Sequence, residues 1–264
     1  MKILRKALTT ILCGGLMFTM GCSNNSSSSS SAATAENNTT TTTPATTTAA
    51  TTTTYKEATE YGKVIALTFD DGPNVTTTNQ VLDVLEKYNV RASFFLVGNN
   101  ISEGTADVVK RAYDMGCEID NHSQTHSYMN KMEADEIQAE VKFTSDKVEE
   151  ITGVPTKFFR PPYIAVNSTM YDNITMPFIC GAGCDDWDEK VDVQTRIDKT
   201  LEQACDGEII LLHDAQGNDQ TVEALDTIIP SLLEEGYELV TVGELFHAKG
   251  VEPFSGIVYS NALQ

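Results

Sequence analysis

The stretch of sequence that decides the fold reads VIALTFDDGP, residues 64–73. Its first six residues form a mostly apolar run without the alternation of a half-exposed strand, which predicts a strand buried on both faces. Gly72 and Pro73 then end the strand in a turn. Because successive side chains of a strand point to opposite faces, Asp70 and Asp71 can converge on one site only at such a strand end. Two interpretations stay open: an acidic cap of the strand, or two carboxylates that share one site with different roles.

Predicted strands and helices alternate on the carboxyl-terminal side of this stretch. Helices are predicted at about 81–88, 106–115, 133–151, 192–204 and 221–235, and strands at 92–97, 118–119, 158–159, 177–184, 208–212 and 238–242. This order is typical of an α/β fold in which crossover helices join parallel strands, either a barrel or a doubly wound sheet. In both architectures the chemistry lies at the carboxyl ends of the strands.

The first 54 residues differ in composition from the rest. Residues 1–21 have a basic start, an apolar core and a small-residue end, which predicts a secretory signal peptide. Cys22 follows directly, and we expect it to carry a lipid that anchors the chain outside the cytoplasm, as in bacterial lipoproteins; secretion after ordinary cleavage is the alternative. Residues 22–54, rich in Ser and Thr, predict a disordered linker. Residues 55–264 have the composition of a single globular domain.

The charge of the chain limits its partners. It has 18 basic and 38 acidic residues, a formal net charge of −20. Nucleic acids and anionic membrane surfaces would repel it, so we expect no nucleic-acid partner and membrane contact only through the lipid. A neutral or cationic substrate such as a polysaccharide fits better. We expect the chain to act as a monomer.

The cysteines of the predicted domain are Cys117, Cys180, Cys184 and Cys205. Cys180 and Cys184 lie in one predicted strand, where residues four apart are about 13 Å apart, beyond disulfide reach. The absence of a CxxC pair argues against a cysteine zinc site. We expect buried free thiols.

Three histidines lie at predicted strand ends or just beyond them. His122 and His126 are four residues apart, a spacing that lets two imidazoles on a helical turn bind one metal ion, although most such pairs are surface residues. Asp71 would complete a set of two histidines and one carboxylate with open positions for water. His213 closes the apolar run 209–212, where it is either a buried histidine bonded to the backbone or a general acid.

Two further residues each have a structural and a functional interpretation. Arg160 precedes two prolines and is either a surface residue or a cation that keeps Asp70 ionised. Trp187 is the only tryptophan and is either a core residue or an exposed ring on which a sugar stacks.

Five motifs, in order along the chain, resemble those of the polysaccharide deacetylase family, which is carbohydrate esterase family 4 with its nodulation-type deacetylase domain. They are TFDDGP at 68–73, HSQTH at 122–126, RPPY at 160–163, DDW at 185–187 and LLHD at 211–214. The resemblance spans about residues 62–246. It implies one catalytic domain, a distorted (β/α) barrel with fewer than eight regular units, and a hydrolase that removes acetyl groups from a polysaccharide.

The resemblance also implies a metal site and a general base. Asp71, His122 and His126 would bind a divalent metal ion, zinc in most members and cobalt or nickel in some. Asp70 would be the base that activates the attacking water. Arg160 would orient and tune Asp70.

The remaining family positions match an acid and a substrate pocket. His213 would be the general acid for the departing sugar, tuned by Asp186. The backbone amide of Tyr163 would stabilise the oxyanion together with the metal. Leu211 would line the acetyl pocket beside Trp187.

The substrate is left open between the N-acetylglucosamine of peptidoglycan or chitin-type glycans and the O-acetyl groups of acetylxylan. The commonest activity of the family favours the amino sugar. Ile164, where most members have a small or polar residue, and the small cysteine-bearing segment 178–186 are more similar to the acetylxylan esterase-like branch from anaerobic bacteria. Isoleucine resists positive φ and adds bulk beside the Tyr163 amide. The alternative function is a catalytically silent, surface-anchored carbohydrate-binding protein, which predicts the loss of at least one catalytic residue.

Overall fold

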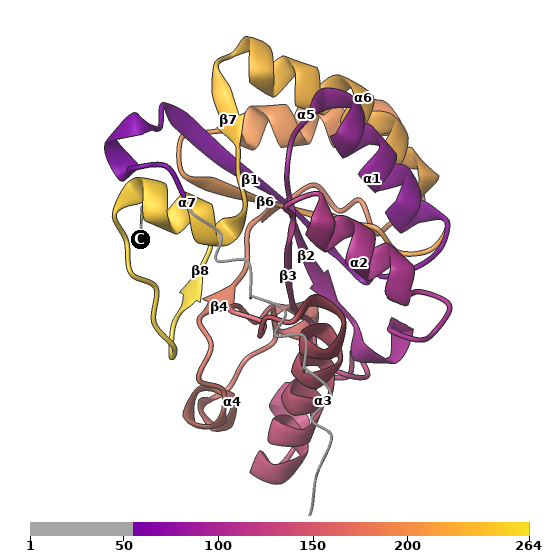
Figure 1. Ribbon diagram of the computed structural model, residues 1–264, viewed down its shortest axis with the longest axis vertical. Coiled ribbons are helices and arrows are strands. Elements are labelled where there is room, and N and C mark those ends of the chain that lie inside the picture. Colours follow the sequence, from indigo (N-terminus) through magenta and orange to yellow (C-terminus); the bar gives the residue numbers. More distant parts are fainter. Residues whose placement is uncertain (1–54, 264) are drawn as a thin grey trace, which may run out of the picture. The chain divides into compact units, whose positions relative to one another are not determined.

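The computed structural model describes residues 55–263 (Figure 1). The predicted signal peptide, Cys22 and the whole of the predicted linker lie outside the described residues, as does Gln264. Among the helices that are described, none has the length and apolar composition needed to cross a membrane.

The central sheet is parallel and has six strands. They are β1 (Lys63–Asp70), β2 (Ser93–Leu96), β3 (Glu118–Asn121), β5 (Ala182–Gly183), β6 (Glu208–His213) and β7 (Tyr237–Leu239). The order is β3-β2-β1-β6-β5, and β7 pairs with the first residues of β1. The register of β1 pairs Asp70 with Phe95 of β2 and with His213 of β6. Two residues that were predicted to carry chemistry therefore end neighbouring strands at the same level.

Short pairings continue the sheet beyond β3 and bend it round on itself. Phe159 bridges Asn121 on one side and Phe178 on the other, and Phe178 belongs to β4 (Phe178–Ile179), which pairs with β8 (Val258–Tyr259). The chain then bends at Gly181, which has φ 142°, and continues into β5 beside β6. The prediction of a distorted barrel with fewer than eight regular units is confirmed.

Three predicted strands differ from the observed ones. The predicted strand 238–242 is confirmed only at its start, because β7 ends at Leu239 and a helix begins at Val242. The predicted strand 177–184 is two short strands, because Gly181 turns the backbone between them; a Cβ there would lie 2.7 Å from the Ile209 carbonyl oxygen. The predicted strand 158–159 is reduced to the bridging residue Phe159.

The predicted helices are confirmed to within a few residues at their ends, with one exception at the start of the first. They are α1 (Thr77–Tyr88), α2 (Ala106–Asp114), α3 (Ala134–Thr152), α5 (Val193–Gln203) and α6 (Asp219–Glu234). The structure also has two short helices, α4 (Ser168–Asn173) and α7 (Val242–Lys249). The apolar spacing predicts a later start for α1, because Thr77–Gln80 contain no aliphatic residue.

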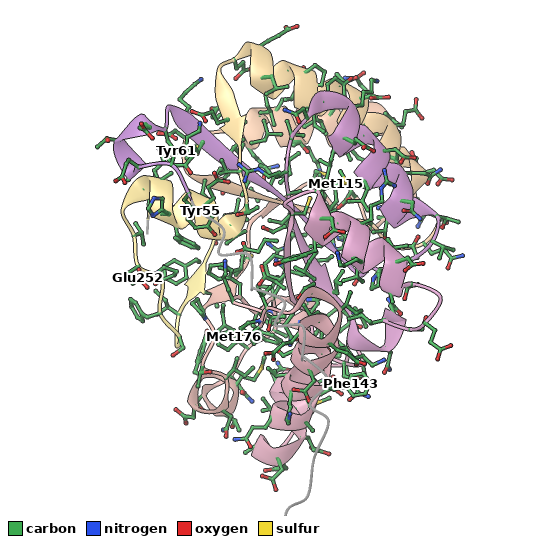
Figure 2. The ribbon with its side chains drawn as sticks, in the orientation of Figure 1. Tyr55, Tyr61, Met115, Phe143, Met176 and Glu252 are labelled. Carbon is green, nitrogen blue, oxygen red and sulfur yellow. The ribbon has the colours of Figure 1, made fainter. Side chains whose placement is uncertain are left out.

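The core lies on both faces of β1, as its unbroken apolar run predicts. Ile65, Leu67 and Phe69 are buried in the cluster that packs beneath α1, α2 and α6. Val64 and Ala66 are buried in a second cluster that includes residues of α7. Figure 2 shows the side chains that fill the space between these helices and the sheet. Thr68 and Asp70 continue the second face of β1 into the carboxyl-terminal end of the barrel, where the apolar core ends.

The four cysteines of residues 55–263 are free, and two of them are buried as expected. Cys117 and Cys184 are buried, whereas Cys180 is partly exposed and Cys205 is exposed. The expectation of burial is wrong for Cys205 because it lies in the turn between α5 and β6, where its Sγ contacts a carboxylate oxygen of Glu208 at 3.3 Å.

Candidate active site

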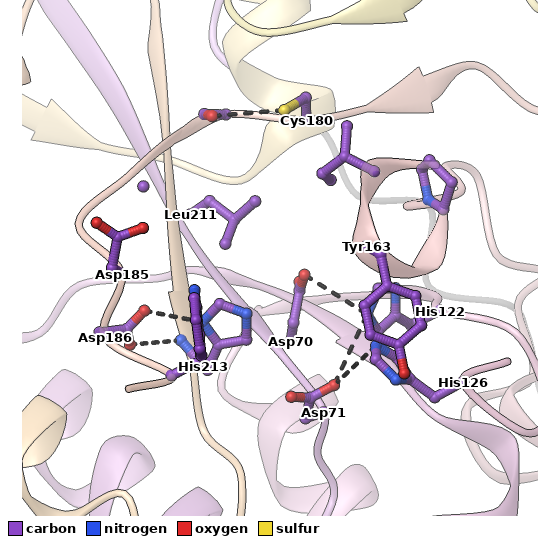
Figure 3. Close-up of a pocket in the computed structure, with 15 residues that line it drawn as sticks. Asp70, Asp71, His122, His126, Tyr163, Cys180, Asp185, Asp186, Leu211 and His213 are labelled. Atoms are coloured by element: carbon purple, nitrogen blue, oxygen red, sulfur yellow. Dashed lines mark hydrogen bonds and ion pairs between the residues drawn. The ribbon is translucent and has the colours of Figure 1, made fainter. Parts of the chain in front are cut away.

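A cavity of about 650 Å³ opens at the carboxyl ends of the strands. Every predicted site residue of the described part lines it except Arg160, which is fully buried behind it. Figure 3 shows Asp186 and His213 on one side, Asp71 with His122 and His126 on the other, and Asp70 between the two sides. The structure thus brings together residues that are spread over about 140 positions of the sequence.

The turn after β1 separates the two aspartates. Asp70 keeps strand geometry and is buried, whereas Asp71 adopts a left-handed conformation with φ 77°. The Gly72 amide donates to Oδ1 of buried Asp214 at 3.1 Å, and the Thr78 hydroxyl donates to its Oδ2. A Cβ at position 72 would lie 2.5 Å from that carboxylate, so the turn requires glycine there. The interpretation of the pair as a simple acidic cap does not fit, because both carboxylates line the cavity.

Three potential ligand atoms converge beside this turn. Nε2 of His122 lies 3.7 Å from Asp71 Oδ1, and Nε2 of His126 lies 3.4 Å from the same oxygen. All the ligand atoms lie within 4.8 Å of one another. His122 Nδ1 lies 2.7 Å from the Arg160 carbonyl oxygen, which makes Nδ1 the protonated nitrogen and leaves Nε2 free to bind. Two imidazoles and a carboxylate in this arrangement fit a divalent metal ion.

The two histidines, four residues apart, lie on a loop after β3 and not on the helical turn that their spacing would also suit. Ser123 and His126 have φ values of 67° and 55°, which fold the loop back on itself. The Ser123 hydroxyl accepts the His126 amide at 3.0 Å, and Thr144 of α3 donates to the Ser123 carbonyl. The loop therefore brings the two imidazoles together without a helical turn.

A buried glutamate on α3 holds the middle of this loop. Glu140 Oε2 accepts the amides of Gln124 and Thr125 at 2.9 and 2.8 Å, and Oε1 accepts the Thr125 hydroxyl at 2.8 Å. Glu140 was not predicted as a site residue from the sequence. Its only signal is a carboxylate placed three residues after Ile137 on the buried face of the helix.

Arg160 lies directly behind Asp70. Its Nη1 donates to Asp70 Oδ1 at 2.6 Å and to the Thr68 hydroxyl at 2.8 Å, and its Nη2 donates to the Cys180 carbonyl at 2.5 Å. Burial alone would raise the pKa of Asp70, but the charge of Arg160, with smaller contributions from His122 and His213, outweighs it and lowers the pKa. The surface position considered for Arg160 is wrong.

His213 is held by Asp186 on the other side of the cavity. Its Nδ1 lies 2.8 Å from Asp186 Oδ1, and its backbone amide donates to Asp186 Oδ2 at 2.8 Å. Burial alone would lower the pKa of His213, but the hydrogen bond and charge of Asp186 outweigh it and raise the pKa to about 9. The imidazole is therefore protonated at neutral pH, with Nδ1 engaged and Nε2 available to the cavity. The alternative of a histidine bonded only to the backbone does not fit.

The remaining wall of the cavity is aromatic and strained. Tyr163 and Ile164 have φ values of 59° and 53°, and the Ile164 amide donates to the Pro161 carbonyl at 2.9 Å. The Tyr163 ring lies 4.7 Å from the His126 ring and stacks at 4.0 Å on Tyr128. Trp187 is 67% exposed, so the assignment of this residue to the core is wrong.

Comparison with known proteins places this geometry in context. The family model described as Polysaccharide deacetylase matches residues 57–175. The chain is 53% identical over 195 residues to the bifunctional xylanase/deacetylase of Pseudobutyrivibrio xylanivorans, covering 74% of this chain and 32% of that protein. It is 36% identical over 188 residues to the peptidoglycan-N-acetylmuramic acid deacetylase PdaC of Bacillus subtilis, covering 71% of this chain and 39% of that protein. The chain therefore spans less than half the length of these curated relatives.

A solved structure matches over a larger share of its own length. The family 4 acetyl xylan esterase from Clostridium thermocellum, in complex with a cobalt ion, is 40% identical with a TM-score of 0.74. The match covers 76% of this chain and 100% of that one.

Proposed function

Because this chain belongs to the polysaccharide deacetylase family, we propose that it is a metal-dependent hydrolase that removes acetyl groups from a polysaccharide. The observation that carries the proposal is the position of Asp70, an ionised carboxylate that lies between a candidate metal site and a protonated histidine in one cavity. The alternative, a catalytically silent carbohydrate-binding protein, predicts that a catalytic group is missing. Each predicted group is present, so we do not adopt it.

We assign Asp71, His122 and His126 as the ligands of a divalent ion, and we propose zinc, with cobalt or nickel as alternatives. When bound, the ion lowers the pKa of a coordinated water molecule and polarises the acetyl carbonyl. The donor set supports zinc because two imidazole nitrogens and one carboxylate oxygen, with a position left for water, are typical of catalytic zinc sites.

The chain's own residues would move the protons. Asp70 takes the proton of the attacking water, since Arg160 keeps its carboxylate ionised and its Oδ2 lies 3.6 Å from Nε2 of the ligand His122. His213 gives its Nε2 proton to the departing sugar oxygen or nitrogen, and Asp186 accepts the Nδ1 proton and so holds the imidazolium in the orientation that permits this.

The cavity wall would bind the acetyl group. We assign the Tyr163 backbone amide as a donor to the oxyanion, because Tyr163 lines the cavity and lies in a left-handed turn of the backbone. Leu211 lies two residues before His213 on β6 and would contact the acetyl methyl group. Trp187 would stack against a sugar ring because its indole is exposed at the cavity.

We propose the O-acetyl groups of a xylan-type polysaccharide as the first substrate. The two relatives named for xylan chemistry share 53% and 40% identity with this chain, and the peptidoglycan relative shares 36%. Ile164 supports the same choice by its resemblance to the acetylxylan esterase-like branch. The N-acetylated amino sugar, which the sequence alone favoured, becomes the second candidate on the strength of the peptidoglycan relative.

The test is acetate release from acetylxylan, chitooligosaccharides and peptidoglycan by the full chain, with and without a chelator. We expect release from acetylxylan above all, loss of release with the chelator, and recovery with zinc. Release that persists after the metal has been removed would refute the mechanism. Binding of these glycans without acetate release from any of them would favour the carbohydrate-binding protein.

We also propose that the domain works outside the cytoplasm, attached to the bacterial membrane through a lipid on Cys22. The support is the sequence of residues 1–22 alone, and secretion after cleavage is the alternative. Expression of the full chain in a lipoprotein-processing bacterium, followed by membrane fractionation, tests the proposal. The Cys22→Ser variant should move from the membrane fraction to the soluble one, and an unchanged distribution would refute lipid anchoring.

A further inference from the structure

A buried arginine that plays no part in the mechanism above lies behind Asp186. Arg196 belongs to α5 and is 1% exposed. Among residues 55–263 no salt bridge joins it to a carboxylate, whereas the other fully buried arginine, Arg160, is paired with Asp70. Burying an unpaired guanidinium is costly unless its donors are satisfied by hydrogen bonds. What Arg196 donates to therefore indicates its role.

The donors of Arg196 reach two backbone carbonyls and two side chains. Nε donates to the Val191 carbonyl at 2.8 Å, and Nη2 donates to the Asp188 carbonyl at 3.2 Å. Nη1 donates to Thr221 Oγ1 at 2.7 Å and to Asn218 Oδ1 at 2.5 Å. The last two residues lie at the start of α6, and both also contact the pair formed by Asp186 and His213.

Arg196 fixes the direction of the Thr221 hydroxyl. A guanidinium can only donate hydrogen bonds, so Thr221 Oγ1 must accept the bond from Nη1. The single hydroxyl proton is then left for Asp186 Oδ2, which lies 2.8 Å away. Without Arg196, the same hydroxyl could rotate and give its proton to another acceptor.

Arg196 fixes the Asn218 side chain in the same way. Because Oδ1 of the amide accepts from Nη1, the Nδ2 group must face the other way. There it donates to the His213 carbonyl at 2.8 Å and lies 3.4 Å from Asp186 Oδ2. One arginine thus sets the polarity of two side chains, and both present donors to Asp186 and His213.

Asp186 in turn accepts donors from every side. Oδ2 receives the His213 amide and the Thr221 hydroxyl, which leaves Oδ1 to accept His213 Nδ1. A carboxylate whose second oxygen is already bonded cannot rotate away from the imidazole. The orientation of His213 therefore depends on donors that Arg196 arranges from behind.

We propose that Arg196 is a positioning residue for the general acid, acting on Asp186 and His213 through Thr221 and Asn218. The proposal rests on the proposed function, since it concerns the proton that His213 gives to the leaving sugar. Arg196 touches neither the cavity nor the candidate metal ligands. The competing explanation is that Arg196 only joins α5 to α6 and contributes to stability.

The test uses two substrates that differ in their need for an acid. Release of acetate from acetylxylan produces a sugar alkoxide that must be protonated, whereas 4-nitrophenyl acetate releases a phenolate that leaves without a proton. In the zinc-loaded full chain, we expect Arg196→Met to lower kcat on acetylxylan by about 10-fold to 100-fold and kcat on 4-nitrophenyl acetate by less than about 3-fold. Arg196→Lys, which keeps a charged donor, should recover part of the loss, and KM should change little.

A second variant carries the test if Arg196→Met does not fold. Thr221→Val keeps the shape of the side chain and removes the hydroxyl, and we expect the same selective loss on acetylxylan. Thr200→Val is the matched control, because Thr200 is also a buried threonine, lies on α5 and does not contact Asp186. Equal losses on both substrates, or equal behaviour of Thr221→Val and Thr200→Val, would overturn the proposal and leave Arg196 a structural residue.

NMR titration of His213 separates this proposal from the proposed function. The charged groups that face His213 are Asp186, Asp70 and Asp71, and none of them is altered in these variants. We expect the His213 midpoint to fall by about one pH unit in Thr221→Val and to stay in place in Thr200→Val. If the unaltered chain releases no acetate from any glycan, the proposed function fails, and this titration alone decides the role of Arg196. A His213 midpoint that is unchanged or raised in Thr221→Val would overturn the proposed role of Arg196.

Discussion

The two sides of the cavity are built in different ways. On the acid side, Asp186 and His213 are joined by direct hydrogen bonds of 2.8 Å, and Asp186 is buried. On the metal side, Asp71 Oδ1 lies 3.4 and 3.7 Å from the Nε2 atoms of His126 and His122, and the three ligand atoms lie within 4.8 Å of one another without a direct hydrogen bond. The acid side is thus organised by the protein's own contacts. The metal side has the spacing that suits ligands around an ion, and hydrogen bonds to Glu140 hold the loop that carries the two histidines.

The largest expected effect separates the two aspartates that end β1. Asp71→Ala should lose both metal and activity, because it removes a ligand, whereas Asp70→Asn should keep the metal and lose turnover by about 10³-fold or more. Metal content after dialysis, measured by mass spectrometry beside acetate release, checks both. Equal metal content in the two variants would show that the division of labour between Asp70 and Asp71 is wrong.

The pH dependence of the acid side is the next effect in size. The pKa of His213 is about 9, above the ordinary value of about 6.5, so the acid is protonated below pH 9 and kcat on acetylxylan should fall as the pH rises through 9. Asp186→Asn removes the charge that raises this pKa and should move the fall toward pH 6.5. The kcat profiles of the unaltered chain and of Asp186→Asn, measured with zinc present, check the shift. Identical profiles in the two chains would contradict the role of His213 as the acid.

The same titration affects stability with a defined sign. Because the folded pKa of His213 lies above the unfolded one, its contribution is complete below about pH 6.5 and is lost as the pH rises through about 9. Asp186→Asn should flatten this part of the stability profile in urea denaturation.

A smaller effect is expected from Glu140, which holds the loop between the candidate metal ligands His122 and His126. Glu140→Gln replaces a carboxylate that accepts two amides and a hydroxyl with a group of weaker accepting power, and should weaken metal affinity by about 10-fold to 100-fold. Calorimetric titration of the metal-free chain with zinc measures it. Glu150→Gln, at an exposed position of the same helix, is the matched control. Unaltered affinity in Glu140→Gln would mean that the loop holds its shape without this carboxylate.

The sequence predicted the order of the strands and helices and the residues around the cavity, because runs of apolar residues and motifs at strand ends are local signals. It did not predict Glu140 or Arg196, whose partners lie up to 25 positions away and are set by how helices pack on loops and on each other. It also did not predict the backbone conformation that brings His122 and His126 together. A spacing of four residues suits a helical turn, but left-handed residues at Ser123 and His126 produce the same convergence on a loop.

The smallest expected effect concerns Ile164, which lies in the wall that both sides share. A left-handed conformation costs a non-glycine residue about 1–2 kcal/mol, so Ile164→Gly relieves strain but also gains freedom in the unfolded chain, which costs about 0.5–1 kcal/mol. The free energy of unfolding should therefore change by less than about 1 kcal/mol. Ile164→Ala removes the bulk and keeps the strain, so Ile164→Gly should be the more stable of the two in urea denaturation. If the bulk of the Ile164 side chain alone sets the substrate, Ile164→Gly and Ile164→Ala should shift the preference between acetylxylan and chitooligosaccharides equally. A shift in Ile164→Gly alone would assign the preference to the backbone conformation of the turn.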